Sequence, residues 1–140
     1  MREILLNQLW IGNAGDGGDP ERLLQAGVVA AINLAAEEPS PVLPRSIIYC
    51  HFPLTDGAPD DPTILRVAIQ TVVSLLRNRI ATLVYCGAGM SRSPAIVAAA
   101  LSIFQGGSPD EKLKEVVAGH PHDVSPYLWE AVCSVCRALQ

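Results

Sequence analysis

The stretch YCGAGMSRSP, residues 85–94, brings a thiol, small residues, a guanidinium and hydroxyls close together. It follows the apolar run 81–84 and precedes a second apolar run, 95–101, so the sequence predicts a loop between a buried strand and a helix. The glycine-rich part, 87–89, allows close backbone approach, and successive N–H groups at a helix start form a nest that binds anions. The alternative is a tight turn with an incidental buried cysteine, but cysteine and arginine at this spacing favour a phosphate site.

Cys86 and Arg92 carry the chemistry expected of such a loop. The helix dipole and the N–H groups stabilise a thiolate, and the pKa of cysteines in such settings falls to about 3.5–7.5, from about 8.5 when free. Arg92 offers a planar fork that can hold two phosphate oxygens and stabilise charge in a transition state. The loop therefore predicts either cleavage or binding of a phosphate ester.

Cleavage by a thiolate expels an alkoxide or phenoxide, which a general acid must protonate. The segment FPLTDGAPDDP, residues 52–62, supplies three aspartates. Asp61 precedes a proline at a predicted helix start, so capping explains it, and Asp60 is interpreted as loop surface or supplementary capping. Asp56 follows a predicted strand and has Gly57 beside it to allow loop movement. Asp56 is therefore the candidate acid, with Asp60 and then Asp61 as alternatives.

Capping residues, prolines and glycines mark where the helices that position these residues begin and end. An Asp or Ser followed by Pro predicts a helix start, because the side-chain oxygen caps the helix and proline fits its first position. The starts predicted in this way are Asp19-Pro20, Asp61-Pro62, Ser93-Pro94, Ser108-Pro109 and Ser125-Pro126. The stops are predicted at Gly27, Gly106-Gly107 and Gly119.

Four apolar runs between the helices have strand character: 9–11, 28–34, 47–52 and 82–85. The nearly continuous apolar character of the second and fourth runs predicts inner strands that are covered on both faces. Strands that alternate with helices indicate an α/β fold with a mostly parallel sheet. The length of 140 residues favours one domain, 1–140, and the segment 35–45 is predicted to be an irregular surface loop.

Composition narrows the functional classes. The net charge of −4 and the absence of a Lys/Arg-rich stretch argue against nucleic acid or an anionic membrane as a partner. The longest apolar run is too short to span a bilayer. We expect a soluble, cytoplasmic protein whose four cysteines (Cys50, Cys86, Cys133 and Cys136) are reduced.

The segment from Cys86 to Ser93 matches Cys-x-x-Gly-x-x-Arg-Ser, and the chain thereby resembles the cysteine-dependent protein phosphatases, most of all their dual-specificity branch. The segment LWIGNA, residues 9–14, is similar to that family's N-terminal strand, and 26–34 is similar to the helix–strand unit that follows it. The resemblance implies a single three-layer α/β/α domain with a central, mostly parallel sheet flanked by helices.

The resemblance also implies a mechanism with a phosphocysteine intermediate. Cys86 attacks phosphorus while Asp56 protonates the leaving oxygen, Asp56 then activates water, and Ser93 hydrogen-bonds the departing thiolate. The Arg92 fork and a run of backbone N–H groups hold the phosphate, and no metal or cofactor is required. The residues of that run are Gly87, Ala88, Gly89, Met90, Ser91 and Arg92.

One residue departs from the family pattern. The family usually has histidine before the nucleophile, where this chain has Tyr85, which cannot carry positive charge near pH 7. We expect activity to survive, with a higher pKa for Cys86 than is usual in the family. The variable loop positions hold no basic residue, which makes a highly anionic inositide a poor candidate substrate. The expected substrate is a phosphorylated protein or small phosphomonoester, with phosphotyrosine first and phosphoserine or phosphothreonine next, and the chain is expected to act as a monomer.

Two other functions stay open: a pseudophosphatase that binds phosphopeptides without turnover, and a sulfurtransferase or arsenate reductase with a similar loop.

Several other side chains that could do chemistry are interpreted as structural. Cys133 and Cys136 are read as core residues, although their spacing allows zinc or redox chemistry. Cys50 is read as a core residue, with a disulfide to Cys86 as the alternative. His51 is assigned a structural role, and the His120, His122 and Asp123 loop ordinary turn chemistry or a wall of the cleft. Glu37 and Glu38 either border the cleft or are solvated.

Overall fold

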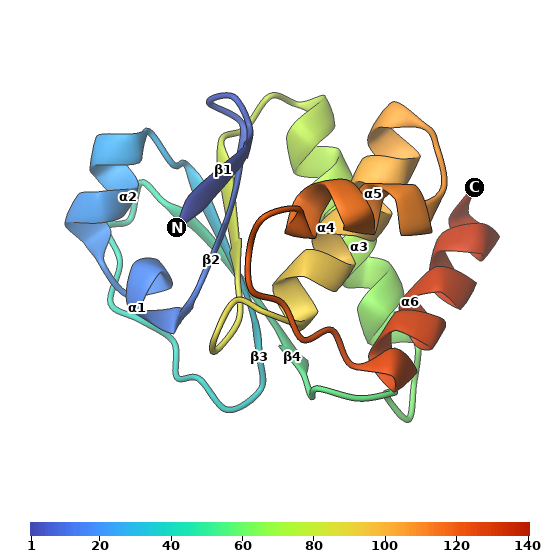
Figure 1. Cartoon of the computed structure of the whole chain (residues 1–140). Helices are drawn as coiled ribbons and strands as arrows, with labels where there is room; N and C mark the ends of the chain where they lie inside the picture. Colours follow the sequence, from blue (N-terminus) through green and yellow to red (C-terminus); the bar gives the residue numbers. More distant parts are fainter.

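The computed structural model describes residues 1–140 and shows a five-stranded sheet between two layers of helices (Figure 1). The strands are β1 (Arg2–Leu5), β2 (Leu9–Gly12), β3 (Ala30–Ala35), β4 (Ile48–Leu54) and β5 (Thr82–Tyr85). Their order in the sheet is β1-β2-β5-β3-β4, and only β1 runs antiparallel to its neighbour. The predicted α/β/α layering and the mostly parallel sheet are confirmed.

Six helices cover the two faces of this sheet. They are α1 (Ala14–Gly17), α2 (Pro20–Ala26), α3 (Thr63–Arg77), α4 (Arg92–Gln105), α5 (Pro109–Val117) and α6 (Pro126–Leu139). The first two lie on one face and the other four on the opposite face (Figure 1). The larger core, of 26 buried residues, lies under the four helices, and the smaller one, of 7, lies under α2. Most of α4 is buried, so the loop of residues 86–91 before it, called the phosphate loop after its predicted role, leads into the centre of the larger core.

Three of the five predicted helix starts are confirmed in detail. The side chains of Asp19, Ser108 and Ser125 occupy the cap positions of α2, α5 and α6, and each accepts a backbone N–H from the first turn. Gly27 ends α2 in the left-handed conformation (φ 81°), as its position predicted.

The other two starts are displaced, and the predictions for them are wrong in detail. Helix α3 begins after Pro62, with Asp61 one residue further out and accepting the N–H of Thr63. Helix α4 begins at Arg92, so Ser91 rather than Ser93 occupies the cap position and Pro94 is the third helical residue. Proline is tolerated there because the N–H groups of the first turn have no acceptor inside the helix.

One strand was not predicted. Strand β1 precedes a tight turn at Asn7, whose φ of 58° is left-handed, and it pairs with β2 as an antiparallel hairpin. No helix of the structure is long and apolar enough to cross a bilayer.

The four parallel strands all end at the same edge of the sheet. Ile11, Val84, Ile32 and Cys50 lie in register across them, so the loops that follow β2, β5, β3 and β4 meet beyond that edge. In open α/β sheets, ligands bind at this carboxyl edge. Every candidate residue of the phosphate chemistry lies in one of these loops or in the helix that follows.

Candidate active site

The loop between β5 and α4 is fixed on both sides by backbone hydrogen bonds. The carbonyl of Gly87 accepts the N–H of Ala14 (3.1 Å), and the carbonyl of Met90 accepts the N–H of Asp123 (2.9 Å). Gly89 has φ +75°, and a Cβ added to it would lie 2.8 Å from the carbonyl oxygen of Gly12. Glycine is required there for both reasons. Cys86, at the start of this loop, is only 2% exposed.

The orientation of the Arg92 guanidinium is fixed by hydrogen bonds. Its side chain is buried, its Nη1 donates to Glu37 Oε2 (2.7 Å) and to the Leu54 carbonyl (2.9 Å), and its Nη2 donates to Glu37 Oε1 (2.5 Å). A guanidinium has five N–H donors, so Nε–H and the second N–H of Nη2 have no partner in the protein. These two donors lie along one edge of the guanidinium plane, in the geometry that binds two oxygens of one phosphate.

Glu37 was only one of two acidic candidates for the cleft border, and the structure gives it a specific contact. It lies in the loop after β3, and the Arg92 guanidinium lowers the pKa of its carboxyl to about 2. In turn, Glu37 is the main cause of a raised Arg92 pKa. Glu38 lies beside it, with Oε1 3.9 Å from the place of a Cβ on Gly87, and makes no bond to Arg92.

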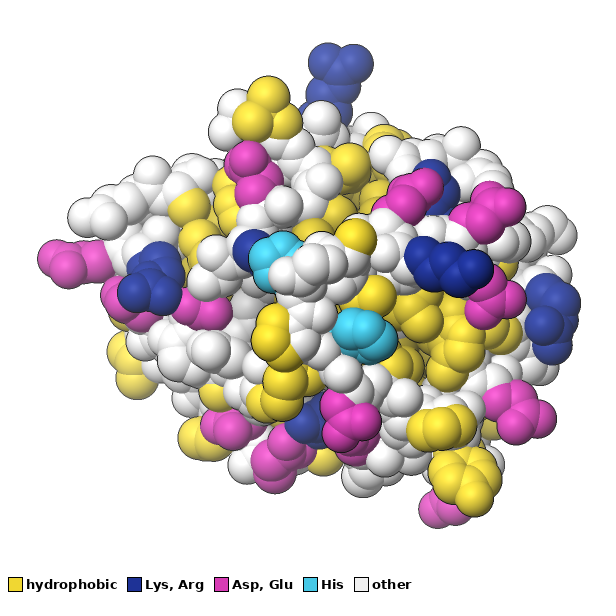
Figure 2. Space-filling view, viewed as in Figure 1, with side chains coloured by type: hydrophobic (Ala, Val, Ile, Leu, Met, Phe, Trp, Pro, Cys, Tyr) yellow, Lys and Arg dark blue, Asp and Glu magenta, His cyan; other side chains and the backbone are white.

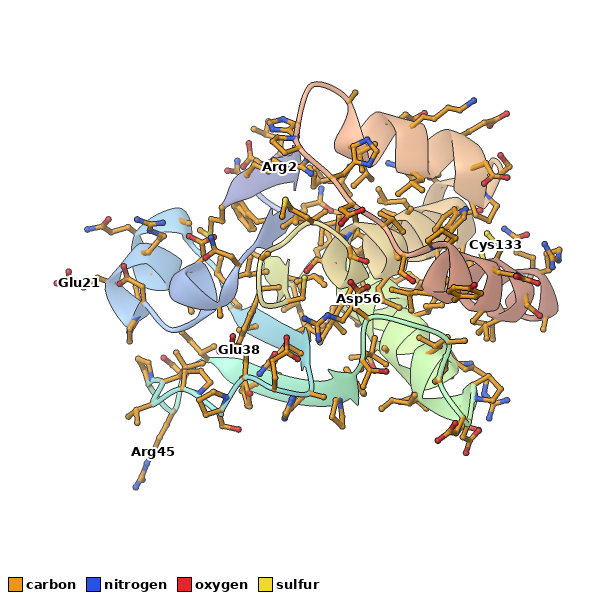
Figure 3. All side chains as sticks on the ribbon, turned by 60° about the horizontal axis from the view of Figure 1, so that its bottom comes forward. Arg2, Glu21, Glu38, Arg45, Asp56 and Cys133 are labelled. Carbon is orange, nitrogen blue, oxygen red and sulfur yellow. The ribbon has the colours of Figure 1, made fainter.

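Asp56 is the aspartate that contacts the phosphate loop. It is exposed in the loop after β4, and its Oδ1 accepts a hydrogen bond from the Ser91 hydroxyl (2.5 Å). Figure 3 shows Asp56 close to the loop between β5 and α4. Asp61 accepts the N–H of Thr63 from one residue outside the cap position predicted for it, and Asp60 makes no hydrogen bond to the loop. Among the three aspartates, Asp56 is the one hydrogen-bonded to this loop.

Ser93 lies in the first turn of α4 and is completely buried. Its hydroxyl forms no hydrogen bond in the protein, so the bond to the Cys86 sulfur that the resemblance implies is not made in this structure. A buried hydroxyl without a partner is uncommon, because desolvation of the group is then uncompensated. The hydroxyl is therefore an unused donor in the first turn of α4.

Tyr85 points to the opposite side of the sheet from Cys86. It is 2% exposed and packs in the smaller core, while Cys86 belongs to the larger one. Its ring lies so close to Gly17 of α1 that a Cβ there would be 2.4 Å from it. Burial raises the pKa of the Tyr85 hydroxyl, which has no hydrogen-bond partner. The phenol thus makes no bond that orders the phosphate loop.

The positions of Cys50 and His51 decide between the alternatives for these two residues. Cys50 is level with Val84 but two strands away, about 10 Å in Cα separation, which is beyond the reach of a disulfide with the neighbouring Cys86. All four cysteines are free. His51 Nε2 contacts the carbonyl of Ala35 (2.8 Å), which confirms its structural role. His120 and His122 are exposed in the loop between α5 and α6, and Cys136 is buried against α4.

The mouth of the site is acidic. In the view of Figure 2, acidic side chains gather at the bottom, where Figure 1 shows the loops after β3 and β4. Glu37, Glu38 and Asp56 all lie at the phosphate loop, and Arg92 is the basic side chain bonded among them.

A sheet of this order, with a buried cysteine and arginine on a glycine loop at its carboxyl edge, is the arrangement expected of a cysteine-dependent phosphatase. The chain belongs to the dual-specificity phosphatase family. It is 32% identical over 114 residues to dual specificity phosphatase 28 of Mus musculus, an alignment that covers 81% of this chain and 69% of that protein. No protein-family model matches the chain.

Solved structures agree with this assignment. The crystal structure of human dual specificity phosphatase 28 has a TM-score of 0.84 with this chain at 28% identity, covering 98% of this chain and 96% of that one. A mouse dual specificity phosphatase crystallised with zinc tungstate has a TM-score of 0.85 at 28% identity, covering 99% and 87%. The family resemblance read from the sequence is confirmed.

Proposed function

We propose that this chain is a phosphoprotein phosphatase that hydrolyses phosphate monoesters through a phosphocysteine intermediate. The observation that carries the proposal is the open edge of the Arg92 guanidinium, fixed by Glu37 and the Leu54 carbonyl in the helix turn that closes the Cys86 loop. The tungstate complex of the mouse relative supports it, because tungstate is a tetrahedral oxyanion like phosphate. Phosphotyrosine is the leading substrate, with phosphoserine and phosphothreonine next.

In the first step, the Cys86 thiolate forms a bond to phosphorus as the bond to the ester oxygen breaks, and Asp56 gives its proton to that oxygen. The Arg92 edge and the backbone N–H groups of 87–92 hold the three equatorial oxygens. In the second step, Asp56 takes a proton from water as the water oxygen bonds phosphorus. The S–P bond breaks, and the Ser93 hydroxyl donates to the returning thiolate.

The proposal extends to the setting of the enzyme. We infer that residues 1–140 form one catalytic domain that acts as a monomer in the cytoplasm, where free cysteines persist. The acidic mouth and the lack of basic residues at the variable loop positions disfavour polyphosphorylated inositides as substrates.

The test is hydrolysis of an aryl phosphate across pH by the wild type and by Cys86→Ser, Asp56→Asn and the matched control Asp60→Asn. Cys86→Ser should abolish turnover. Asp56→Asn should lower kcat by roughly 100-fold or more and remove the fall in activity at alkaline pH, while Asp60→Asn stays close to the wild type. An unchanged pH profile in Asp56→Asn contradicts its role. A wild type that binds vanadate but never releases phosphate supports the phosphopeptide-binding pseudophosphatase instead.

A further inference from the structure

The side chain of Ser91 joins three segments of the site. Ser91 is the last residue of the phosphate loop and only 7% exposed. Its hydroxyl donates to Asp56 Oδ1 (2.5 Å), in the loop after β4, and accepts the backbone N–H of Ser125 (3.1 Å), at the start of α6. The backbone N–H of Ser91 belongs to the proposed phosphate nest, whereas its side chain is not needed for that nest.

The direction of these bonds is fixed by the donors. A serine hydroxyl has one proton and two lone pairs, and a backbone N–H can only donate. Ser125 is itself held in place, because its side chain caps α6 and its carbonyl accepts the N–H of Trp129 (2.9 Å). With the N–H of Ser125 on one lone pair, the Ser91 hydroxyl directs its proton to Asp56.

Asp56 needs a hydrogen bond of this kind to hold its carboxylate in one orientation. Its loop contains no helix or strand between Leu54 and Thr63, its side chain is exposed, and Ser91 is the hydrogen-bond partner of its carboxylate. A free carboxylate would sample several rotamers, and a proton donor displaced by about 1 Å can lose two orders of magnitude in rate. Because Oδ1 accepts from Ser91, the transferable proton is carried on Oδ2.

We propose that Ser91 is a positioning residue that orients Asp56 for proton transfer to the leaving group. The proposal rests on the proposed role of Asp56 as the general acid. It concerns the hydroxyl of Ser91 alone, since the backbone of residue 91 contributes to phosphate binding whatever its side chain.

The experiment compares kcat/KM of Ser91→Ala and the wild type on two aryl phosphates, p-nitrophenyl phosphate and phenyl phosphate. Phenoxide is the more basic leaving group and depends more on protonation. Ser91→Ala should lower kcat/KM on phenyl phosphate by roughly tenfold, the loss of one well-aligned hydrogen bond, and on p-nitrophenyl phosphate by less than about threefold. Vanadate inhibition, which reports the phosphate loop, should stay within about twofold.

Three further variants separate the possible explanations. Ser91→Thr keeps the hydroxyl and should restore most of the activity on phenyl phosphate. Ser125→Ala removes a helix cap but keeps the backbone N–H, so it should change stability and leave the ratio of the two substrates unchanged. In an Asp56→Asn background, Ser91→Ala should have no further effect.

Equal losses on both substrates together with weaker vanadate inhibition would show that Ser91 supports the phosphate loop, and would overturn the inference. A Ser91→Ala enzyme with wild-type rates on both substrates would overturn it while Asp56→Asn still shows the loss expected of a general acid. If Asp56→Asn itself leaves the substrate ratio unchanged, the proposed role of Asp56 and this inference fail together.

Discussion

Replacing Glu37 with Gln tests how firmly Arg92 is held. Glutamine keeps the shape of the side chain, but its amide nitrogen cannot accept, so one of the two bonds from the guanidinium is lost and the other keeps only a neutral acceptor. Glu37 is 54% exposed, and solvent therefore screens the pair. Bidentate geometry and a buried arginine place the loss near the upper end for partly exposed pairs, about 1 kcal/mol.

The same free energy sets the expected effect on catalysis. A cost of about 1 kcal/mol in holding the Arg92 edge corresponds to about a fivefold loss in kcat/KM on an aryl phosphate. The matched control is Glu38→Gln, which removes the same charge at the phosphate loop and breaks no bond to Arg92. Its effect measures electrostatics alone, so the difference between the two variants isolates the positioning of the guanidinium.

The stability of Glu37→Gln should also depend on pH in a defined direction. The pKa of Glu37 falls from its ordinary value of 4.5 to about 2 in the folded protein. Its contribution is therefore fully present above about pH 4.5 and is lost as the pH falls toward 2, because the unfolded chain binds the proton first. In urea unfolding at pH 6, 4 and 3, the gap between wild type and Glu37→Gln should shrink with falling pH. Equal activities of the Glu37 and Glu38 variants, or a gap independent of pH, would refute this reasoning.

Two further predictions concern the sides of the loop. Tyr85→Phe removes a buried hydroxyl without a partner and should raise the free energy of unfolding by about 1 kcal/mol with activity nearly unchanged, as measured by urea unfolding and kcat/KM; a clear loss of stability would contradict it. Gly89→Ala combines a positive φ with a Cβ 2.8 Å from the Gly12 carbonyl and should lower kcat/KM by roughly 100-fold. Gly106→Ala has the same kind of φ with nothing within 4 Å of its Cβ, so it should lose stability but keep activity, and similar kcat/KM values for the two variants would count against the clash.

Much of the fold was predictable because its signals are local. Proline and capping residues mark helix starts within one or two residues, and apolar runs mark the inner strands. The nucleophile loop was predictable for the same reason, since its residues are contiguous in sequence. Even the direction of Tyr85 could have been read from strand alternation, which places it on the face of Leu83 and opposite Val84 and Cys86.

The hydrogen bonds that hold Arg92 and Asp56 in place were not predictable from local sequence signals. Glu37 reaches Arg92 across 55 positions, from an irregular loop with no periodicity, and the sequence offered two adjacent glutamates with no means of choosing between them. Ser91 reaches Asp56 across 35 positions. Such contacts depend on the order of strands in the sheet, which brings the loops after β3, β4 and β5 to one edge and which no local pattern encodes.

Tyr85 is a case in which a local sequence signal and long-range contacts must be considered together. Tyr85 stands where the family usually has a histidine beside the nucleophile, so its phenol could influence the thiolate of Cys86. The phenol lies in the smaller core against Gly17, and the thiol lies in the larger core across the sheet. An effect of residue 85 on the nucleophile therefore passes either through the backbone that joins β5 to the loop or through α1, which contains both Gly17 beside the ring and Ala14, whose N–H holds the loop. The loop itself is held by the N–H groups of Ala14 and Asp123, and its closing arginine by Glu37 and Leu54. The Tyr85 hydroxyl takes part in none of these bonds.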